Sequence, residues 1–200
     1  AVAVTALAME SRYVQDAGAV ASSANGAPRI AFAHLAPFDT ETTVTIKVDG
    51  VLELPNVAFG DSTPYITLTT GTHTAEIYPV GSIVPVLTRT LDLVSGDYTA
   101  LVVGGANGWD LDVLLLEDDN EPSAGALKVR LGHLAPFTSS VAGTLADVRR
   151  QDGTPLIPMS VPYGTIADYA SRPPGTYDLK VTAPGGTPTL IDPMPAMFGA

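Results

Sequence analysis

Three histidines are the side chains best suited to acid–base chemistry in this sequence, and two of them occupy equivalent positions. His34 and His133 each open the same pentapeptide, His-Leu-Ala-Pro-Phe. An acid–base residue duplicated in this way would be unusual, so we predict that both imidazoles are structural and bond backbone carbonyl groups. A tyrosine, Tyr177, takes the place of His73 in the second copy, which predicts a surface strand position for His73.

Acidic side chains gather after the last apolar run of the first copy and could bind calcium, which takes six to eight oxygen ligands. Their spacing is not that of an EF-hand, because the glycine and the terminal glutamate are misplaced. We therefore favour a solvated acidic linker over residues 117–121. The remaining calcium candidates are Asp110, Asp112, Asp118 and Asp119. No other metal and no cofactor is expected.

Common catalytic motifs are absent from the sequence: it has no G-x-S-x-G, H-E-x-x-H, P-loop or dinucleotide fingerprint. The lack of cysteine excludes disulfides, thiolate metal sites and cysteine nucleophiles. Residues 104–108 are glycine-rich, but no helical pattern follows them, so they predict a hairpin loop. Trp109 beside them suits packing better than sugar stacking. The sequence therefore favours a protein that is not an enzyme.

Charge and hydropathy narrow the expected partners and location. The 200 residues include 10 Lys and Arg against 21 Asp and Glu, a net charge of −11, so no nucleic-acid partner is expected. No apolar run approaches the roughly 20 residues that span a bilayer, so no membrane span is expected. We interpret Ala1 as a mature N-terminus left after signal-peptide removal, which predicts an extracellular or cell-surface location. A chain trimmed at its start is the alternative.

Partial matches follow the shared pentapeptide in the same order and indicate an internal duplication. They are Asp49-Gly50 with Asp152-Gly153, Val57–Gly60 with Val161–Gly164, Tyr65 with Tyr169, and Gly71–His73 with Gly175–Tyr177. We divide the chain into an N-terminal segment, 1–28, a first repeat, 29–121, and a second repeat, 122–200.

Short apolar runs between turns containing Gly or Pro, with no long helical pattern, predict an all-β fold in which each repeat is a sandwich or a barrel. Residues 43–48 alternate polar and apolar types, which is the period of a strand. Asp49-Gly50 then supplies a two-residue turn that requires positive φ. The other strands expected in the first repeat are 29–35, 51–54, 65–69, 73–78, 86–93, 98–104 and 111–116.

The second repeat has no counterpart for the last two of these strands. If Phe198 aligns with Val94, nothing matching 98–104 or 111–116 follows it. A sandwich without them exposes unpaired backbone groups and an open core, so we predict that the N-terminal segment completes it by strand addition. The donor residues are Val2, Val4, Ala6, Leu7 and Met9. The acceptor edge is expected at Tyr177, Leu179, Val181, Leu190, Ile191, Met197 and Phe198.

The source of the donor strand stays open at this point. The tether of about 19 residues could reach across one chain, so self-completion is sterically possible. Donation to a neighbour is head-to-tail and, repeated, builds a filament. A truncated sequence would need no donor. Residues 1–9 could also form a helix, which Ala, Leu and Met favour, although β-branched Val2, Val4 and Thr5 weigh against it.

Several segments of the two repeats carry a family resemblance. They are 29–37, 48–50, 56–60, Tyr65, 100–104 and 114–118 in the first repeat and, more weakly, 133–137, 163–164, Tyr169 and 175–179 in the second. With these residues the chain resembles the domain-of-unknown-function 4397 family of secreted bacterial and archaeal proteins. The resemblance implies immunoglobulin-like β-sandwiches, often in tandem, and an extracellular location. It supplies no catalytic residues.

These observations lead to one main hypothesis and one alternative. The chain is expected to be a structural subunit of an extracellular filament or cell-surface assembly, with copies of itself as head-to-tail partners. The charge is uneven: residues 29–121 hold 3 basic and 14 acidic side chains, net −11, whereas residues 122–200 hold 6 and 5, net +1. The alternative is a secreted adhesion module that binds carbohydrate or protein through its sandwich-end loops.

Overall fold

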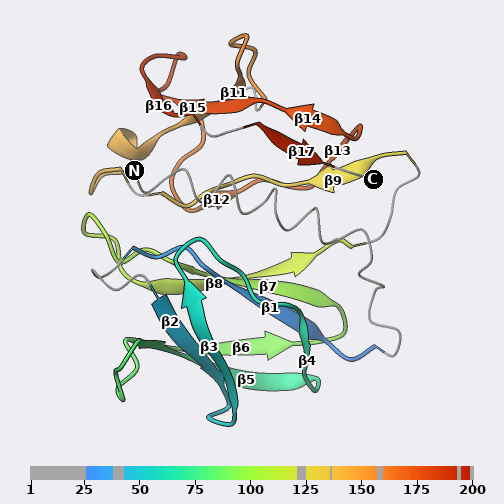
Figure 1. The fold of residues 1–200 in the computed structure, drawn as a ribbon. Helices are drawn as coiled ribbons and strands as arrows, with labels where there is room; N and C mark the ends of the chain where they lie inside the picture. Colours follow the sequence, from blue (N-terminus) through green and yellow to red (C-terminus); the bar gives the residue numbers. More distant parts are fainter. Residues whose placement is uncertain are drawn as a thin grey trace. The chain divides into compact units, whose positions relative to one another are not determined.

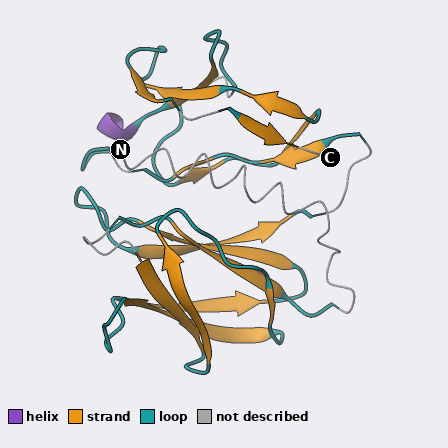
Figure 2. Ribbon diagram, in the orientation of Figure 1, coloured by secondary structure: helices purple, strands orange, loops and turns teal. Residues whose placement is uncertain are grey.

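The computed structural model describes residues 26–37, 43–120, 125–135, 137–156, 160–192 and 195–198. This part of the chain is all-β, and its one helical element is a short 3₁₀ turn, η2 (Ala142–Thr144) (Figure 2). It divides into two compact units, a first unit up to Asn120 and a second unit from Gly125 onward. Within the described ranges, no helix has the length and apolar character needed to cross a bilayer.

The first unit is a β-sandwich of two four-stranded sheets (Figure 1). One sheet holds, in spatial order, β4 (Ile66–Thr67), β1 (Arg29–His34), β7 (Asp97–Val103) and β8 (Asp112–Asp118). The other holds β3 (Leu52–Ala58), β2 (Thr43–Val48), β5 (Gly71–Pro79) and β6 (Leu87–Leu93). Every pair is antiparallel except β1 and β7, which run parallel. The expected strands are present within a few residues, although β3 continues to Ala58.

Alternating side chains of both sheets form the core of the first unit. β2 places Val44, Ile46 and Val48 in the interior and its intervening residues at the half-buried outer face, as the sequence period predicts. Ile30 and Phe32 of β1 belong to the same apolar cluster. The turn after β2 has Asp49 at φ 54° and Gly50 at φ 66°, which confirms the positive-φ hairpin turn.

β1 and β7 are buried on both faces. Ala31, Ala33, Leu101 and Val103 point away from the core just described, yet none of them is more than 4 % exposed. All seven residues of β7 are buried. Burial on both faces explains why the sequence of β7 ends in a continuous apolar run instead of an alternating one.

The second unit is built from shorter strands. Its three-stranded sheet has the order β11 (Asp147–Arg150), β15 (Leu179–Thr182) and β16 (Thr189–Ile191). Three two-stranded pairs accompany it: β10 (Gly132–His133) with β12 (Thr165–Ile166), β9 (Leu127–Val129) with β13 (Ala170–Arg172), and β14 (Gly175–Tyr177) with β17 (Ala196–Phe198). Ala135, Ala146, Val181 and Ile191 form an apolar cluster in this unit.

We predict that Phe32→Ala destabilises the first unit by about 3–5 kcal/mol, because it removes a fully buried ring and leaves a cavity. Val51→Ala is the matched control, since Val51 is 90 % exposed, and it should change stability by less than about 0.5 kcal/mol. Urea unfolding followed by circular dichroism measures both. Equal effects from the two substitutions would contradict the assignment of the core.

Candidate functional site

The two units hold their pentapeptide histidines by the same backbone contact. The Gly60 amide donates to the His34 carbonyl over 2.8 Å, and the Gly164 amide donates to the His133 carbonyl over 2.8 Å. Two residues before each histidine, the carbonyls of Phe32 and Leu131 also accept equivalent bonds, each of 2.8 Å, from the amides of Thr63 and Ala167 respectively. The shared pentapeptide therefore makes the same backbone contacts in both units.

His34 lies in the interior of the first unit. It is fully buried, and its ring meets Phe59 edge-on at 6.0 Å between centroids. Burial lowers its pKa to about 4, because a charged imidazolium would lose its hydration there. A histidine held neutral in this way fills a structural position.

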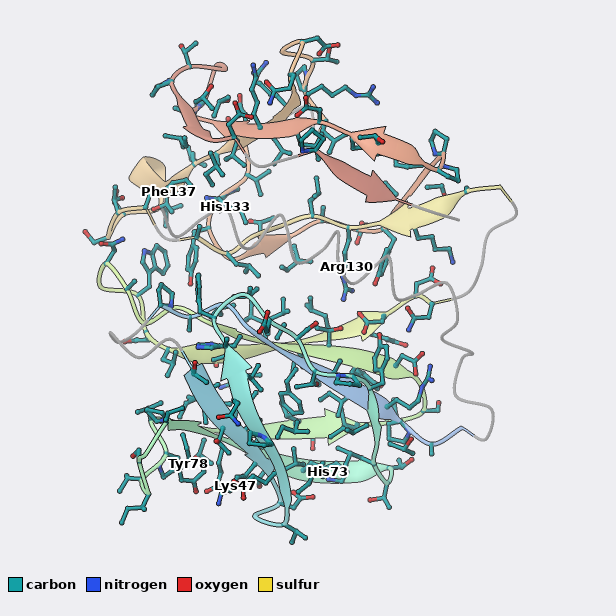
Figure 3. The ribbon with its side chains drawn as sticks, in the orientation of Figure 1. Lys47, His73, Tyr78, Arg130, His133 and Phe137 are labelled. Carbon is teal, nitrogen blue, oxygen red and sulfur yellow. The ribbon has the colours of Figure 1, made fainter. Side chains whose placement is uncertain are left out.

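His133 has a related environment in the second unit. Its ring contacts Phe137, with 5.1 Å between the ring centroids (Figure 3). Tyr163 meets it edge-on at 6.3 Å. Its Nε2 atom lies 2.5 Å from the Thr144 carbonyl oxygen, which confirms the predicted backbone bond for this histidine. Burial lowers the pKa of His133, and the bond to Thr144 opposes that shift.

Arg29 and Asp97 form a two-pronged ion pair at the start of the parallel strands β1 and β7. The parallel register places the two residues opposite each other. Nε and Nη2 of Arg29 donate to the two carboxylate oxygens over 2.7 and 2.5 Å. Burial alone would raise the pKa of Asp97, but the bonds from Arg29 and Asn120 outweigh it and hold that pKa below its usual range.

A second carboxylate, Asp118, joins the end of β8 to the same polar cluster. It accepts bonds from the Tyr65 hydroxyl over 2.7 Å and the Thr99 hydroxyl over 2.6 Å. Asn120 connects the two carboxylates, because its amide donates to Asp97 over 2.9 Å and to the Tyr65 oxygen over 3.0 Å. The Arg29 guanidinium stacks over the Tyr65 ring at 5.1 Å. These bonds tie Asp118 and Asn120, at the end of the first unit, to β7.

His73 is buried, with 6 % of its surface exposed, so the predicted surface position is wrong (Figure 3). Its Nδ1 lies 2.7 Å from the Asp49 carboxylate and its Nε2 lies 2.8 Å from the Thr69 carbonyl. Both neighbours are acceptors, so both ring nitrogens donate only in the imidazolium form. The bonds to Asp49 and Thr69 raise the pKa of His73 against its burial.

In the second unit, Asp147 is a buried carboxylate that accepts several hydrogen bonds, as Asp97 does in the first unit. Its carboxylate accepts bonds from the Ser160 hydroxyl over 2.6 Å, from Nη2 of Arg149 over 2.7 Å and from the Gly185 amide over 3.1 Å. Burial would raise its pKa, but these three donors outweigh burial and lower it. The residue therefore ties three separate segments of this unit together.

The calcium candidates do not come together. Asp112 and Asp118 lie at the two ends of β8, roughly 20 Å apart at about 3.3 Å per residue. The Asp112 carboxylate accepts a bond from the Val113 amide and faces Arg89 at 3.5 Å, while Asp118 is engaged in the polar cluster. Within the described ranges, no three His, Asp or Glu side chains are grouped as metal ligands.

The predicted donor residues Val2, Val4, Ala6, Leu7 and Met9 lie outside the described residues. The predicted acceptor residues occupy β14 to β17. Leu179, Val181 and Ile191 are buried, whereas Leu190 is 42 % exposed and Tyr177 is half-buried. Met197 and Phe198 lie in β17, which pairs with β14. β15 is flanked on both sides, by β11 and β16, whereas β14, β16 and β17 each have one neighbour in the described part of the chain.

Sequence reasoning missed the polar clusters around Asp97 and Asp147. Asp97 lies 68 residues from Arg29, and only the parallel pairing of β1 with β7 brings the two together. Asp147 meets Gly185 across 38 residues. No local spacing marks such pairs, although an acidic residue that opens an apolar strand is a weak signal.

We expect Asp97→Ala to destabilise the first unit by about 3 kcal/mol, because it leaves the Arg29 guanidinium partly buried without its carboxylate. Glu53→Ala is the control. It breaks the exposed pair with Lys47, at 3.6 Å, and should cost less than about 0.5 kcal/mol. Chemical denaturation at neutral pH compares the two, and similar losses would show that the cluster contributes nothing special.

Acidification should weaken the first unit through His34. The folded-state pKa of about 4 lies below the ordinary 6.5, so the unfolded chain takes up the proton first and stability falls as pH drops from 6.5. The loss reaches about 3 kcal/mol at pH 4. The raised pKa of His73 adds no loss in this window, because His73 is charged in both states below pH 6.5.

The measurement is the free energy of unfolding of wild type and His34→Gln at pH 7 and pH 4. Wild type should lose about 3 kcal/mol more than the variant between the two pH values. Parallel losses in both proteins would rule out His34 as the titrating group.

Comparison with known proteins gives a family and little more. No curated protein matches the sequence. One solved structure, described as the Bacillus anthracis TIE protein, aligns at 14 % identity with a TM-score of 0.26. The alignment covers 87 % of this chain and 31 % of that one, so this chain spans about a third of that structure, and a likeness at this level carries no argument.

A family model described as "Domain of unknown function (DUF4397)" matches residues 28–144. The match begins just before β1, contains strands β1 to β8 of the first unit and continues to the end of η2. Since it covers more than half of the 200 residues, the chain belongs to the DUF4397 family.

Proposed function

We propose that this chain is a non-catalytic structural subunit of an extracellular assembly. In this proposal it consists of two tandem immunoglobulin-like β-sandwich repeats, and copies join head-to-tail by donating a strand to the second unit. One observation carries the idea. β1 is paired on both sides, by β4 and β7, whereas the described part of the second unit gives β9 and β10 one neighbour each, β13 and β12.

Shared strand registers support the tandem-repeat part of the proposal. Lys128 faces Ser171 as Arg29 faces Thr67, at the same place in the sequence alignment. Val181 aligns with Ile77, and the partner of Val181, Val148, takes the place that Ile46 has opposite Ile77, one residue from the position that the match of Asp49-Gly50 with Asp152-Gly153 gives. The first pair equates β9 with the start of β1 and β13 with β4, and the second equates β11 with β2 and β15 with β5.

The same comparison of strand registers favours a different acceptor edge from the one that the sequence predicted. Gly175 faces Phe198 as Gly71 faces Leu93, so Phe198 corresponds to Leu93 and β17 to the end of β6. β6 is an edge strand in the first unit as well. The first unit has a further strand, β7, for which the described part of the second unit has no counterpart, and β7 pairs with β1. We therefore place the acceptor edge on Lys128–His133 instead of on β14 to β17.

Residues 1–9 suit this position because β7 is buried on both faces. A strand beside β1 needs apolar side chains in both alternating sets. Val2, Val4 and Ala6 form one such set in the N-terminal segment, and Leu7 and Met9 belong to the other. In the parallel register of β7, the first set would match Tyr98, Ala100 and Val102, which point into the core.

The uneven charge favours contact between the first repeat of one copy and the second repeat of another. Residues 29–121 carry a net charge of −11 and residues 122–200 a net charge of +1. Contact between two first repeats sets acidic surfaces against each other, whereas a head-to-tail contact does not. A head-to-tail arrangement need not close and can extend as a filament.

The experiment compares the full chain with a variant lacking residues 1–12, by sedimentation over a range of concentrations and by electron microscopy. We expect the full chain to form filaments and the shortened chain to stay monomeric. Val4→Asp should also block assembly, because it puts a charge into a strand buried on both faces. Arg12→Gln lowers the net charge by the same amount outside the donor residues and should still assemble.

Monomers of the full chain at every concentration would overturn filament formation. If deletion of residues 1–12 then lowered the stability of the monomer, the strand would be donated within one chain. If it changed neither size nor stability, strand donation by residues 1–12 would be wrong altogether.

A further inference from the structure

The loop between β5 and β6, residues 80–86, carries a group of exposed aliphatic side chains, which we call the apolar tip. Ile83 is 94 % exposed and Val84 65 %, while Val80 and Val86 are 47 % and 48 % exposed. The loop extends from the ends of β5 and β6 (Figure 1). Exposed aliphatic groups that cluster in this way are typical of an interaction site.

The hairpin itself does not require these side chains. The corresponding connection in the second unit, Ala183–Pro188, joins β15 to β16 with the sequence Ala-Pro-Gly-Gly-Thr-Pro. It closes through a bond from the Ala183 amide to the Pro188 carbonyl, over 2.9 Å, and has no large apolar residue. Closure of such a loop therefore does not require the apolar side chains of Val80, Ile83 and Val84.

The apolar tip satisfies much of its own backbone. The amides of Val80, Ser82 and Val86 donate to backbone carbonyls within 3.3 Å. Ser82 bonds the Val84 carbonyl and the Val84 amide through its hydroxyl, over 2.8 and 3.1 Å. Pro79 and Pro85 have no amide hydrogen to satisfy. These bonds lower the cost of moving the amides of Val80, Ser82, Val84 and Val86 into an apolar medium.

The base of the loop has the chemistry of a membrane interface. No charged residue occurs between Ile77 and Arg89. Tyr78, just before the apolar tip, lies beneath the Lys47 ammonium group, which is 5.2 Å from the ring centroid (Figure 3). Tyrosine and lysine are enriched where a protein meets lipid headgroups.

We propose that the apolar tip inserts into the outer hydrocarbon of a lipid bilayer, with Tyr78 and Lys47 at the headgroup level. A specific protein pocket fits less well, because protein hot spots favour Trp, Tyr and Arg, and the apolar tip offers only Val and Ile. Its one side-chain hydroxyl, on Ser82, is already used within the loop. The acidic first repeat favours a zwitterionic surface over an anionic one.

This inference does not depend on strand donation. One apolar tip is a small anchor, so a single chain should bind reversibly. An assembly that displays many copies would bind far more tightly through multivalency.

The test is co-flotation of the full chain with phosphatidylcholine vesicles over a range of lipid concentrations. We expect reversible binding that weakens by roughly tenfold or more in the double variant I83S/V84S. V51S is the matched control: Val51 is 90 % exposed but lies after the β2–β3 turn, next to the start of β5 and away from the apolar tip. Its binding should equal that of wild type.

Replacing a third of the lipid with phosphatidylglycerol should weaken binding. Circular dichroism establishes that each variant is folded, so a loss of binding cannot come from unfolding. Failure of wild type to float with phosphatidylcholine at any lipid concentration would overturn the inference. Equal binding by wild type and I83S/V84S would also overturn it.

Discussion

The parallel pairing of β1 with β7 is the interaction on which the first unit depends. It joins residues 68 positions apart, sets Arg29 against Asp97 and makes β1 an inner strand of its sheet. A strand with neighbours on both sides has no unpaired backbone edge, and here both of its faces are buried as well. The polar cluster around Asp97 and Asp118 then holds the start of β1, β7 and the end of β8 in register.

The second unit repeats the contacts of β1 with β4 but, in its described part, not those of β1 with β7. In the proposed function, a further strand would therefore add beside Lys128–His133 and not beside β14 to β17. The donor must be apolar on both faces, because β7 is, and the N-terminal segment meets that condition. In the proposed function, the chain acts through this backbone requirement.

Local sequence patterns predicted the local structure well. The alternation over residues 43–48 and the Asp49-Gly50 turn depend only on neighbouring residues, and both appear as expected. His73 was misplaced because its environment is not local: the β2–β3 turn brings in Asp49, 24 residues away, and gives the buried imidazole a charged partner. The strand partner of β7 was equally hidden, since an apolar run predicts a buried strand without saying what it pairs with.

A disulfide between chains tests the proposed strand addition most directly, because the chain contains no cysteine of its own. In the register of β7, Val4 would lie beside Leu131, as Ala100 lies beside Phe32. Val4→Cys in one chain and Leu131→Cys in another should then form a linked pair under mild oxidation, while Leu190→Cys in place of Leu131→Cys should not. Linkage to position 190 with none to position 131 would contradict the proposed edge, and no linkage at either position would contradict donation between chains.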